Sequence, residues 1–227
     1  MRMRNQSVSR PLIVVALVAA AVFVAITVIV TTNRSLAFDS QAFAIASHLR
    51  SPWLTTVARV VTFLGLIAIV GPALLLAGGL LIAHRHRSRA TALVLGGALA
   101  WAAVWVAKSL VNRTRPSGAL VHTAGQSYPS AHAANSVGWL ALAIAIAVLV
   151  PARGGRAAVM IGGAVIAVLV GLSRIYLRAH FASDVLAGYA LAVTMYALAA
   201  IAVVASRPRR EPAATPTASP SQASGVS

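Results

Sequence analysis

Residues 173–184 concentrate charge between two long apolar runs, and Arg174, His180 and Asp184 are their most reactive side chains. Residues four apart lie on one face of a helix, so Asp184 can accept the proton on one ring nitrogen of His180. The other nitrogen then keeps its lone pair and can act as a nucleophile or base, while Arg174 offers a planar fork suited to phosphate oxygens. These residues favour phosphoryl transfer to histidine. A membrane-interface turn with snorkelling arginines, in which His180 only hydrogen-bonds Asp184, is the simpler interpretation.

Two further polar stretches precede this one. Lys108 ends an apolar run and Arg115 follows seven residues later, so both can reach one aqueous rim. Pro129 and Ser130 suit the start of a helix, where free amides bind anions and the Ser130 hydroxyl can donate to them. His132 would then lie beside the bound group as a general acid for the leaving oxygen. The simpler interpretations are a snorkelling helix end for Lys108 and an interfacial histidine for His132.

The composition is that of an integral membrane protein, with a mean hydropathy of +0.84 and 10% charged residues. The net charge of +16 does not indicate a nucleic-acid partner, because the basic residues flank apolar runs and form no continuous basic face. The chain has no cysteine, and its acidic residues are Asp39, Asp184 and Glu211. Two-metal phosphatases need clustered carboxylates. We therefore predict no metal and no cofactor, and expect cations and backbone amides to offset phosphate charge.

Apolar runs predict an all-α polytopic fold with six membrane-spanning helices, over residues 12–31, 57–83, 90–107, 133–150, 157–172 and 185–205. The mixed pattern of residues 33–56 predicts a short interfacial helix between spans one and two. Residues 1–210 are expected to form one membrane domain. Residues 211–227, rich in Ala, Pro, Ser and Thr, predict a disordered cytoplasmic tail.

The distribution of basic residues predicts the orientation. With the N-terminus inside, eleven of the nineteen Lys and Arg residues are cytoplasmic, which favours cytoplasmic N- and C-termini. Residues 108–132 and 173–184 are separated by two membrane crossings, so they must share one face. That face is extracytoplasmic in this orientation.

The three polar stretches resemble, in order and spacing, the signature motifs of the type 2 phosphatidic acid phosphatase (PAP2) family. The motifs are Lys-x6-Arg-Pro at residues 108–116, Pro-Ser-Gly-His, which is Pro-Ser-Ala-His in this chain, at residues 129–132, and Ser-Arg-x5-His-x3-Asp at residues 173–184. The resemblance also covers the six-helix layout of residues 12–205. It implies a lipid phosphatase of the bacterial plasma membrane.

The resemblance also implies a role for each motif residue. His180 would be the nucleophile that becomes phosphorylated, Asp184 would orient it, and His132 would protonate the leaving group. The phosphoryl oxygens would be held by the side chains of Lys108, Arg115, Ser130 and Arg174. The backbone amide of Ala131 would also contact them.

One motif position departs from the family, because Ala131 stands where glycine is usual. A positive φ there would strain alanine by about 1 kcal/mol or more, whereas a helical conformation would make the change harmless. Arg113, Arg178 and His122 lie near the site but outside the motifs. We expect them to be solvated loop residues rather than headgroup contacts.

The resulting prediction is a metal-independent lipid phosphate or diphosphate phosphatase that acts in the outer leaflet through a phosphohistidine. Polyprenyl diphosphate is the favoured substrate, followed by phosphatidic acid or phosphatidylglycerophosphate, and membrane lipids are the other expected partners. A non-hydrolytic module that binds or transports phospholipid is one alternative. A vanadate-using haloperoxidase is another, although six spans and a lipid-facing site disfavour it. The sequence does not indicate an oligomeric state.

Overall fold

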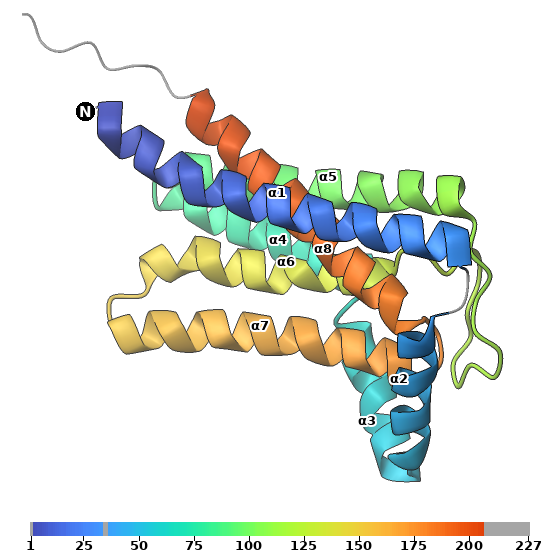
Figure 1. Cartoon of the computed structure of the whole chain (residues 1–227). Coiled ribbons are helices and arrows are strands. Elements are labelled where there is room, and N and C mark those ends of the chain that lie inside the picture. The colour runs from blue at the N-terminus through green and yellow to red at the C-terminus, as the bar shows by residue number, and fades with distance from the viewer. Residues whose placement is uncertain (1, 34–35, 207–227) are drawn as a thin grey trace, which may run out of the picture.

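The computed structural model describes residues 2–33 and 36–206 and places the side chains of residues 10–32 and 36–206. This part of the chain is all-helical, which confirms the predicted fold class. Its elements, coloured in chain order in Figure 1, are α1 (Arg2–Asn33), α2 (Ala37–His48), α3 (Pro52–Phe63), α4 (Ile67–Ala83), α5 (Arg87–Val111), α6 (Ala131–Ile146), the 3-10 turn η1 (Ala147–Leu149), α7 (Arg153–Tyr176) and α8 (Ala182–Ala205). The predicted tail, residues 211–227, lies outside the described residues.

The long helices form a bundle that is covered at one end by two short helices. Helices α1 and α4 to α7 run roughly along a common direction, α8 crosses them obliquely, and α2 and α3 lie across that direction (Figure 1). Both short helices pack against α7, where Ala46, Ala58 and Tyr176 form a small buried cluster. The start of α1 and the end of α8 lie at the opposite end of the bundle (Figure 1).

The predicted second span, residues 57–83, is not one straight helix. Five helices of the described chain are long and apolar enough to cross a membrane, and a sixth span exists if α3 and α4 count as one helix bent by 47°. The break exposes backbone carbonyls that α6 satisfies: Trp139 Nε1 donates to the carbonyl of Leu64 at 2.8 Å, and Asn135 Nδ2 donates to that of Gly65 at 3.1 Å. The bend is therefore fixed by contacts that hydropathy does not report.

Gly65 lies where the break approaches α6 and α7. A Cβ at this position would come within 2.7 Å of Val170 Cγ1 and 2.9 Å of His132 Cβ. No side chain fits there without displacing a neighbour, so glycine lets the bend rest directly against the beginning of α6.

The predicted interfacial segment, residues 33–56, also contains two helices rather than one. Helix α2 occupies residues 37–48, and α3 has already begun at Pro52. Ser51 caps α3 by accepting a hydrogen bond from the amide of Leu54 at 3.2 Å, and Pro52 follows as the first helical residue. Serine before proline is a helix start signal, and it ends the predicted segment early. A position of α2 in the membrane interface stays a prediction.

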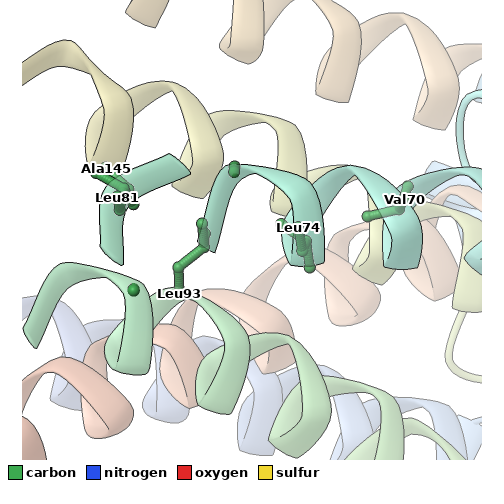
Figure 2. Packing of buried hydrophobic residues seen from close by; sticks show 7 residues of the cluster. Val70, Leu74, Leu81, Leu93 and Ala145 are labelled. Carbon is green, nitrogen blue, oxygen red and sulfur yellow. The ribbon is translucent and has the colours of Figure 1, made fainter. Parts of the chain in front are cut away.

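The core at the centre of the bundle is built from small and branched side chains of three helices. Figure 2 shows Val70, Leu74 and Leu81 of α4 packed with Leu93 of α5 and Ala145 of α6. Helix α8, rich in alanine, packs against α1, α5 and α6. Small residues let helix backbones approach closely, which is the usual way membrane helices associate. This packing fixes the helix ends that carry the polar residues.

Candidate active site

The three polar stretches meet at the end of the bundle that α2 and α3 cover. They belong to the ends of α5 and α7, to the beginnings of α6 and α8, and to the loop of residues 112–130 (Figure 1). Backbone hydrogen bonds join them: the amide of Ser130 donates to the carbonyl of Asp184 at 2.9 Å, and that of Leu120 donates to the carbonyl of Leu177 at 2.9 Å. The stretches therefore lie together at one end of the bundle, and their shared face of the membrane stays a prediction.

His180 lies in the short loop between α7 and α8 and is 2% exposed. The prediction that His180 and Asp184 share one face of a helix is therefore wrong, because α8 begins only at Ala182, although the loop still brings the two side chains together. Arg115 Nη1 donates to His180 Nε2 at 3.2 Å. Because arginine is only a donor, Nε2 must be the acceptor and the ring proton is on Nδ1, which faces Asp184 Oδ2 at 3.5 Å. Burial lowers the pKa of His180 from 6.5 to about 4, an effect that Asp184 opposes and Arg174 and Arg115 reinforce. The ring is therefore neutral at neutral pH, with its lone pair on Nε2.

Asp184 is fully buried in the first turn of α8, and both of its oxygens have partners. Oδ2 accepts from the backbone amide of Phe181 at 3.0 Å and from the hydroxyl of Ser127 at 2.5 Å. Oδ1 accepts from Arg113 Nη1 at 2.7 Å. These contacts fix the carboxylate next to the imidazole.

Backbone carbonyls of the loop before α6 hold two cations beside His180. Lys108 Nζ donates to the carbonyl of Gln126 at 2.8 Å. Arg115 donates to the carbonyls of Gly125 at 3.0 Å and Ala124 at 2.8 Å. Since these acceptors carry no full charge, the cations keep their positive charge available for an anion.

Arg174 is a third cation at the site, and it is buried. It is 5% exposed, and its Nη1 donates to the hydroxyl of Thr62 on α3 at 2.9 Å. Its Nε is buried and has no hydrogen-bond partner among the described residues. A buried donor without a partner is costly, and such donors in native proteins call for an explanation. A phosphate oxygen would satisfy it.

The start of α6 supplies the remaining motif residues. Ser130 is the N-cap, and its hydroxyl accepts from the amide of Ala133 at 3.4 Å. Ala131 is the first helical residue and is not among the described residues with positive φ. Alanine is therefore unstrained at this position and keeps the amide donor. His132 is partly buried, and it interacts electrostatically with four charged or titratable site residues, namely Arg174, His180, Arg115 and Lys108.

Arg113 corrects one of the predictions. It was expected to be a solvated loop residue, but it is 7% exposed and pairs with both Asp184 and Asp39 of α2. His122 is exposed, as expected. Arg178 is partly buried, with its Cζ 4.8 Å from the centre of the Phe43 ring, so it too is not simply solvated.

Asp39, Ser127 and Thr62 were not predicted as site residues. Ser127 and Thr62 contact motif residues directly, and Asp39 is linked to Asp184 through Arg113. Asp39 did carry a signal. It is one of only three acidic residues in the chain, and it shares the buried face of α2 with Phe43 and Ala46 at helical spacing. A buried acid in a chain so poor in acids needs a cationic partner. Ser127 and Thr62 carried no comparable signal.

A bundle of membrane helices with a histidine, a carboxylate and several cations at one end is the architecture of a membrane phosphatase. The chain matches the PAP2 superfamily over residues 89–208 and belongs to it. It is a PAP2-type lipid phosphate phosphatase, a phosphoric monoester hydrolase.

Particular relatives support this assignment. The chain is 30% identical over 180 residues to phosphatidylglycerophosphatase B of Bacillus subtilis (strain 168), covering 78% of this chain and 88% of the relative. The crystal structure of a transmembrane PAP2-type phosphatidylglycerolphosphate phosphatase from Bacillus subtilis superposes with a TM-score of 0.74 at 29% identity, over 81% of this chain and 93% of that one. The crystal structure of Aquifex aeolicus LpxE has a TM-score of 0.59 at 22% identity, over 73% and 96% of the two chains, and shares the fold.

Proposed function

We propose that this protein hydrolyses the phosphate monoester of a membrane phospholipid through a phosphohistidine at His180, without a metal ion. The observation that carries the proposal is the buried ring of His180, held between Asp184 and Arg115. Asp184 faces its Nδ1–H, and Nε2 points at the cation Arg115. An oriented imidazole with its lone pair among cations is suited to attack a phosphoryl group.

In the first step, the Nε2 lone pair attacks phosphorus while the bond from phosphorus to the ester oxygen breaks. His132 gives a proton to the departing oxygen, so the lipid leaves as an alcohol. His180 is then an imidazolium bonded to phosphorus, and the carboxylate of Asp184 balances its charge. His132 is left neutral, ready to act as a base.

In the second step, water attacks the phosphohistidine and the P–N bond breaks. His132 removes a proton from this water, and Nε2 recovers its lone pair as phosphate leaves. Lys108, Arg115, Arg174, the Ser130 hydroxyl and the amide of Ala131 hold the phosphoryl oxygens in both steps. Donors fixed before reaction stabilise the developing charge without reorganising, which is often the largest catalytic contribution.

Phosphatidylglycerophosphate becomes the first candidate substrate. Polyprenyl diphosphate was favoured by the sequence argument, but the relatives at 30% and 29% identity are named for phosphatidylglycerophosphate. Polyprenyl diphosphate and phosphatidic acid remain comparison substrates.

An apolar groove supports a lipid substrate with acyl chains. Its volume is about 460 Å³, and side chains of α2, α3 and α7 line it. Ser173 and Tyr176 belong to this lining and flank the site residue Arg174 in sequence. In this proposal the acyl chains lie in the groove, the termini are cytoplasmic and the site faces the extracytoplasmic side.

The test is phosphate release by detergent-purified protein from phosphatidylglycerophosphate, phosphatidic acid and polyprenyl diphosphate, with a chelator present throughout. We expect turnover in chelator, strongest with phosphatidylglycerophosphate, and acid-labile, base-stable phosphate on the protein after rapid quenching. His180→Ala should remove both. His132→Ala should slow monophosphate lipids more than diphosphate lipids, because the phosphate group that leaves from a lipid diphosphate needs less help from a proton than the alkoxide that leaves from a monophosphate. Chelator-sensitive turnover, or full activity without His180, would contradict the mechanism.

A further inference from the structure

A buried network outside the three motifs surrounds the carboxylate of Asp184. The guanidinium of Arg113 bridges two carboxylates, with 2.9 Å to Asp39 Oδ2 and 2.7 Å to Asp184 Oδ1. All three groups are buried. Breaking such an arrangement leaves a charge buried without its partner, so each member strongly constrains the others.

Ser183 joins this network to the backbone of α8. Its amide donates to Asp39 Oδ1 at 2.8 Å, and its hydroxyl donates to Asp39 Oδ2 at 2.7 Å. Arg113 Nη1 also donates to the Ser183 hydroxyl at 2.8 Å. Amides in the first turn of a helix have no partner within it. Asp39 supplies that partner, and its negative charge also suits the positive end of α8. The residue after Ser183 is Asp184 itself.

Arg113 additionally contacts the loop that carries His180. Its Cζ lies 4.0 Å from the centre of the Phe181 ring, which is a cation–π distance. Phe181 in turn contacts Phe43 of α2, with ring centres 5.6 Å apart. One face of α2 thus reaches the His180 loop through Phe43 and the Asp184 turn through Asp39.

We propose that Asp39 and Arg113 are positioning residues for the reaction, which hold Asp184 in the orientation that keeps the His180 ring ready for attack. The proposal rests on the proposed roles of His180 and Asp184. Arg113 holds Asp184 Oδ1, while Phe181 and Ser127 hold Oδ2. Without Arg113 one oxygen loses its charged partner, and the carboxylate can turn away from the imidazole. Helix α2 then helps to set the geometry of the active site.

The test uses Asp39→Asn, Arg113→Lys and Ser183→Ala, with Arg178→Lys as a matched control. Arg178 also stacks on a phenylalanine at this end of the bundle, and no contact to Asp184 is seen for it within the described residues. Phosphoenzyme formation is followed by rapid quenching, and kcat and KM are measured with phosphatidylglycerophosphate. We expect Asp39→Asn and Arg113→Lys to slow phosphoenzyme formation by about 10- to 100-fold. Losses of this size are typical when a hydrogen-bond partner that orients a metal-binding side chain is removed. KM should change little, because neither residue is placed among the phosphate-binding groups.

A double-mutant cycle with Asp184→Asn separates positioning from a merely structural role. If Arg113 acts through Asp184, adding Arg113→Lys to Asp184→Asn should slow the reaction little further. Full additivity in the cycle would overturn the inference. If Arg113→Lys does not fold, Asp39→Asn and Ser183→Ala carry the test, because both are small changes. Unfolding of all three variants would assign a structural role and also overturn it.

The two proposals fail in different ways. A wild-type protein that turns over lipid but forms no phosphohistidine at His180 would refute the proposed mechanism. If the wild-type protein forms the phosphohistidine and the variants form it at the same rate, only the positioning role is refuted.

Discussion

The chemistry of His180 depends on the few groups that touch it. Its ring is buried, its Nε2 accepts from Arg115 and its Nδ1 faces Asp184. A histidine in water would be partly protonated near pH 6.5 and would then lack a lone pair. Burial removes that problem, because it disfavours the charged form.

The lowered pKa of His180 predicts a specific dependence on pH. Its value of about 4, against 6.5 for an ordinary histidine, means that the folded protein binds the proton less tightly than the unfolded chain. The resulting stability is complete above pH 6.5 and is lost as the pH falls towards 4. Thermal unfolding between pH 7 and 4 should therefore show a steeper loss of Tm for wild type than for His180→Ala. Equal slopes for wild type and His180→Ala would contradict the shift.

Arg174 predicts a strong effect of a substitution that keeps its charge. Arg174→Lys loses the fork that contacts Thr62 and leaves the buried Nε position without a donor. We expect kcat/KM for phosphatidylglycerophosphate to fall by about 100-fold, as when one fixed oxyanion donor is lost. Arg153→Lys, at an exposed position at the opposite end of the bundle, is the control. A near-normal rate would make Arg174 an interfacial anchor.

At the scale of elements, the sequence predicted the spans better than their shapes. Long apolar runs identified five helices directly, and Lys108, Arg174 and Asp184 lie at helix ends as predicted. His180, which the spacing placed on one helix with Asp184, lies instead in the loop before α8. The bend between α3 and α4 was missed because hydropathy is averaged over a window, whereas the bend depends on Asn135 and Trp139 of another helix. Ion pairs such as Asp39 with Arg113 join residues far apart in sequence, and no local pattern reports them.

The bend predicts different outcomes for two glycines. Gly65→Ala would place a Cβ within 3 Å of Val170 and His132, so the beginning of α6 must shift. We expect a loss of about 1–3 kcal/mol of stability, typical of overpacking, together with reduced activity. Gly79→Ala, in α4 with nothing within 4 Å of the new Cβ, should be neutral or slightly stabilising. Thermal unfolding and phosphate release measure both, and identical behaviour of the two variants would contradict the role of Gly65.

At the scale of the whole molecule, all three motifs lie at one end of the bundle and the basic turn before α5 lies at the other. Successive long helices cross the bundle in opposite directions, so the connections between them alternate between its two ends (Figure 1). The number of crossings therefore places the motifs at one end and the basic turn at the other. The positive-inside rule then assigns the site to the extracytoplasmic side. The side of the membrane is a prediction, because the helical arrangement is the same in either orientation.

This orientation can be tested in the cysteine-free chain. Ser117→Cys, exposed in the loop at the site end, should react with a membrane-impermeant thiol reagent in intact cells. His84→Cys, exposed at the opposite end, should react only after permeabilisation. Both substitutions avoid the site, so activity should be retained. The reverse labelling pattern would place the site in the cytoplasm.

The site takes its parts from segments far apart in the chain, from Asp39 in α2 to Asp184 in α8. During synthesis the N-terminal segments reach the membrane first, and α8 emerges last. Lys108 and Arg115 therefore enter the bilayer region before His180 and Asp184 exist. In the proposed mechanism, the nascent protein then carries two phosphate-binding cations but lacks its nucleophile until its final helix is inserted. Catalysis thus begins only when synthesis of the membrane domain is complete, and a chain cut short before α8 is inert towards the lipids around it.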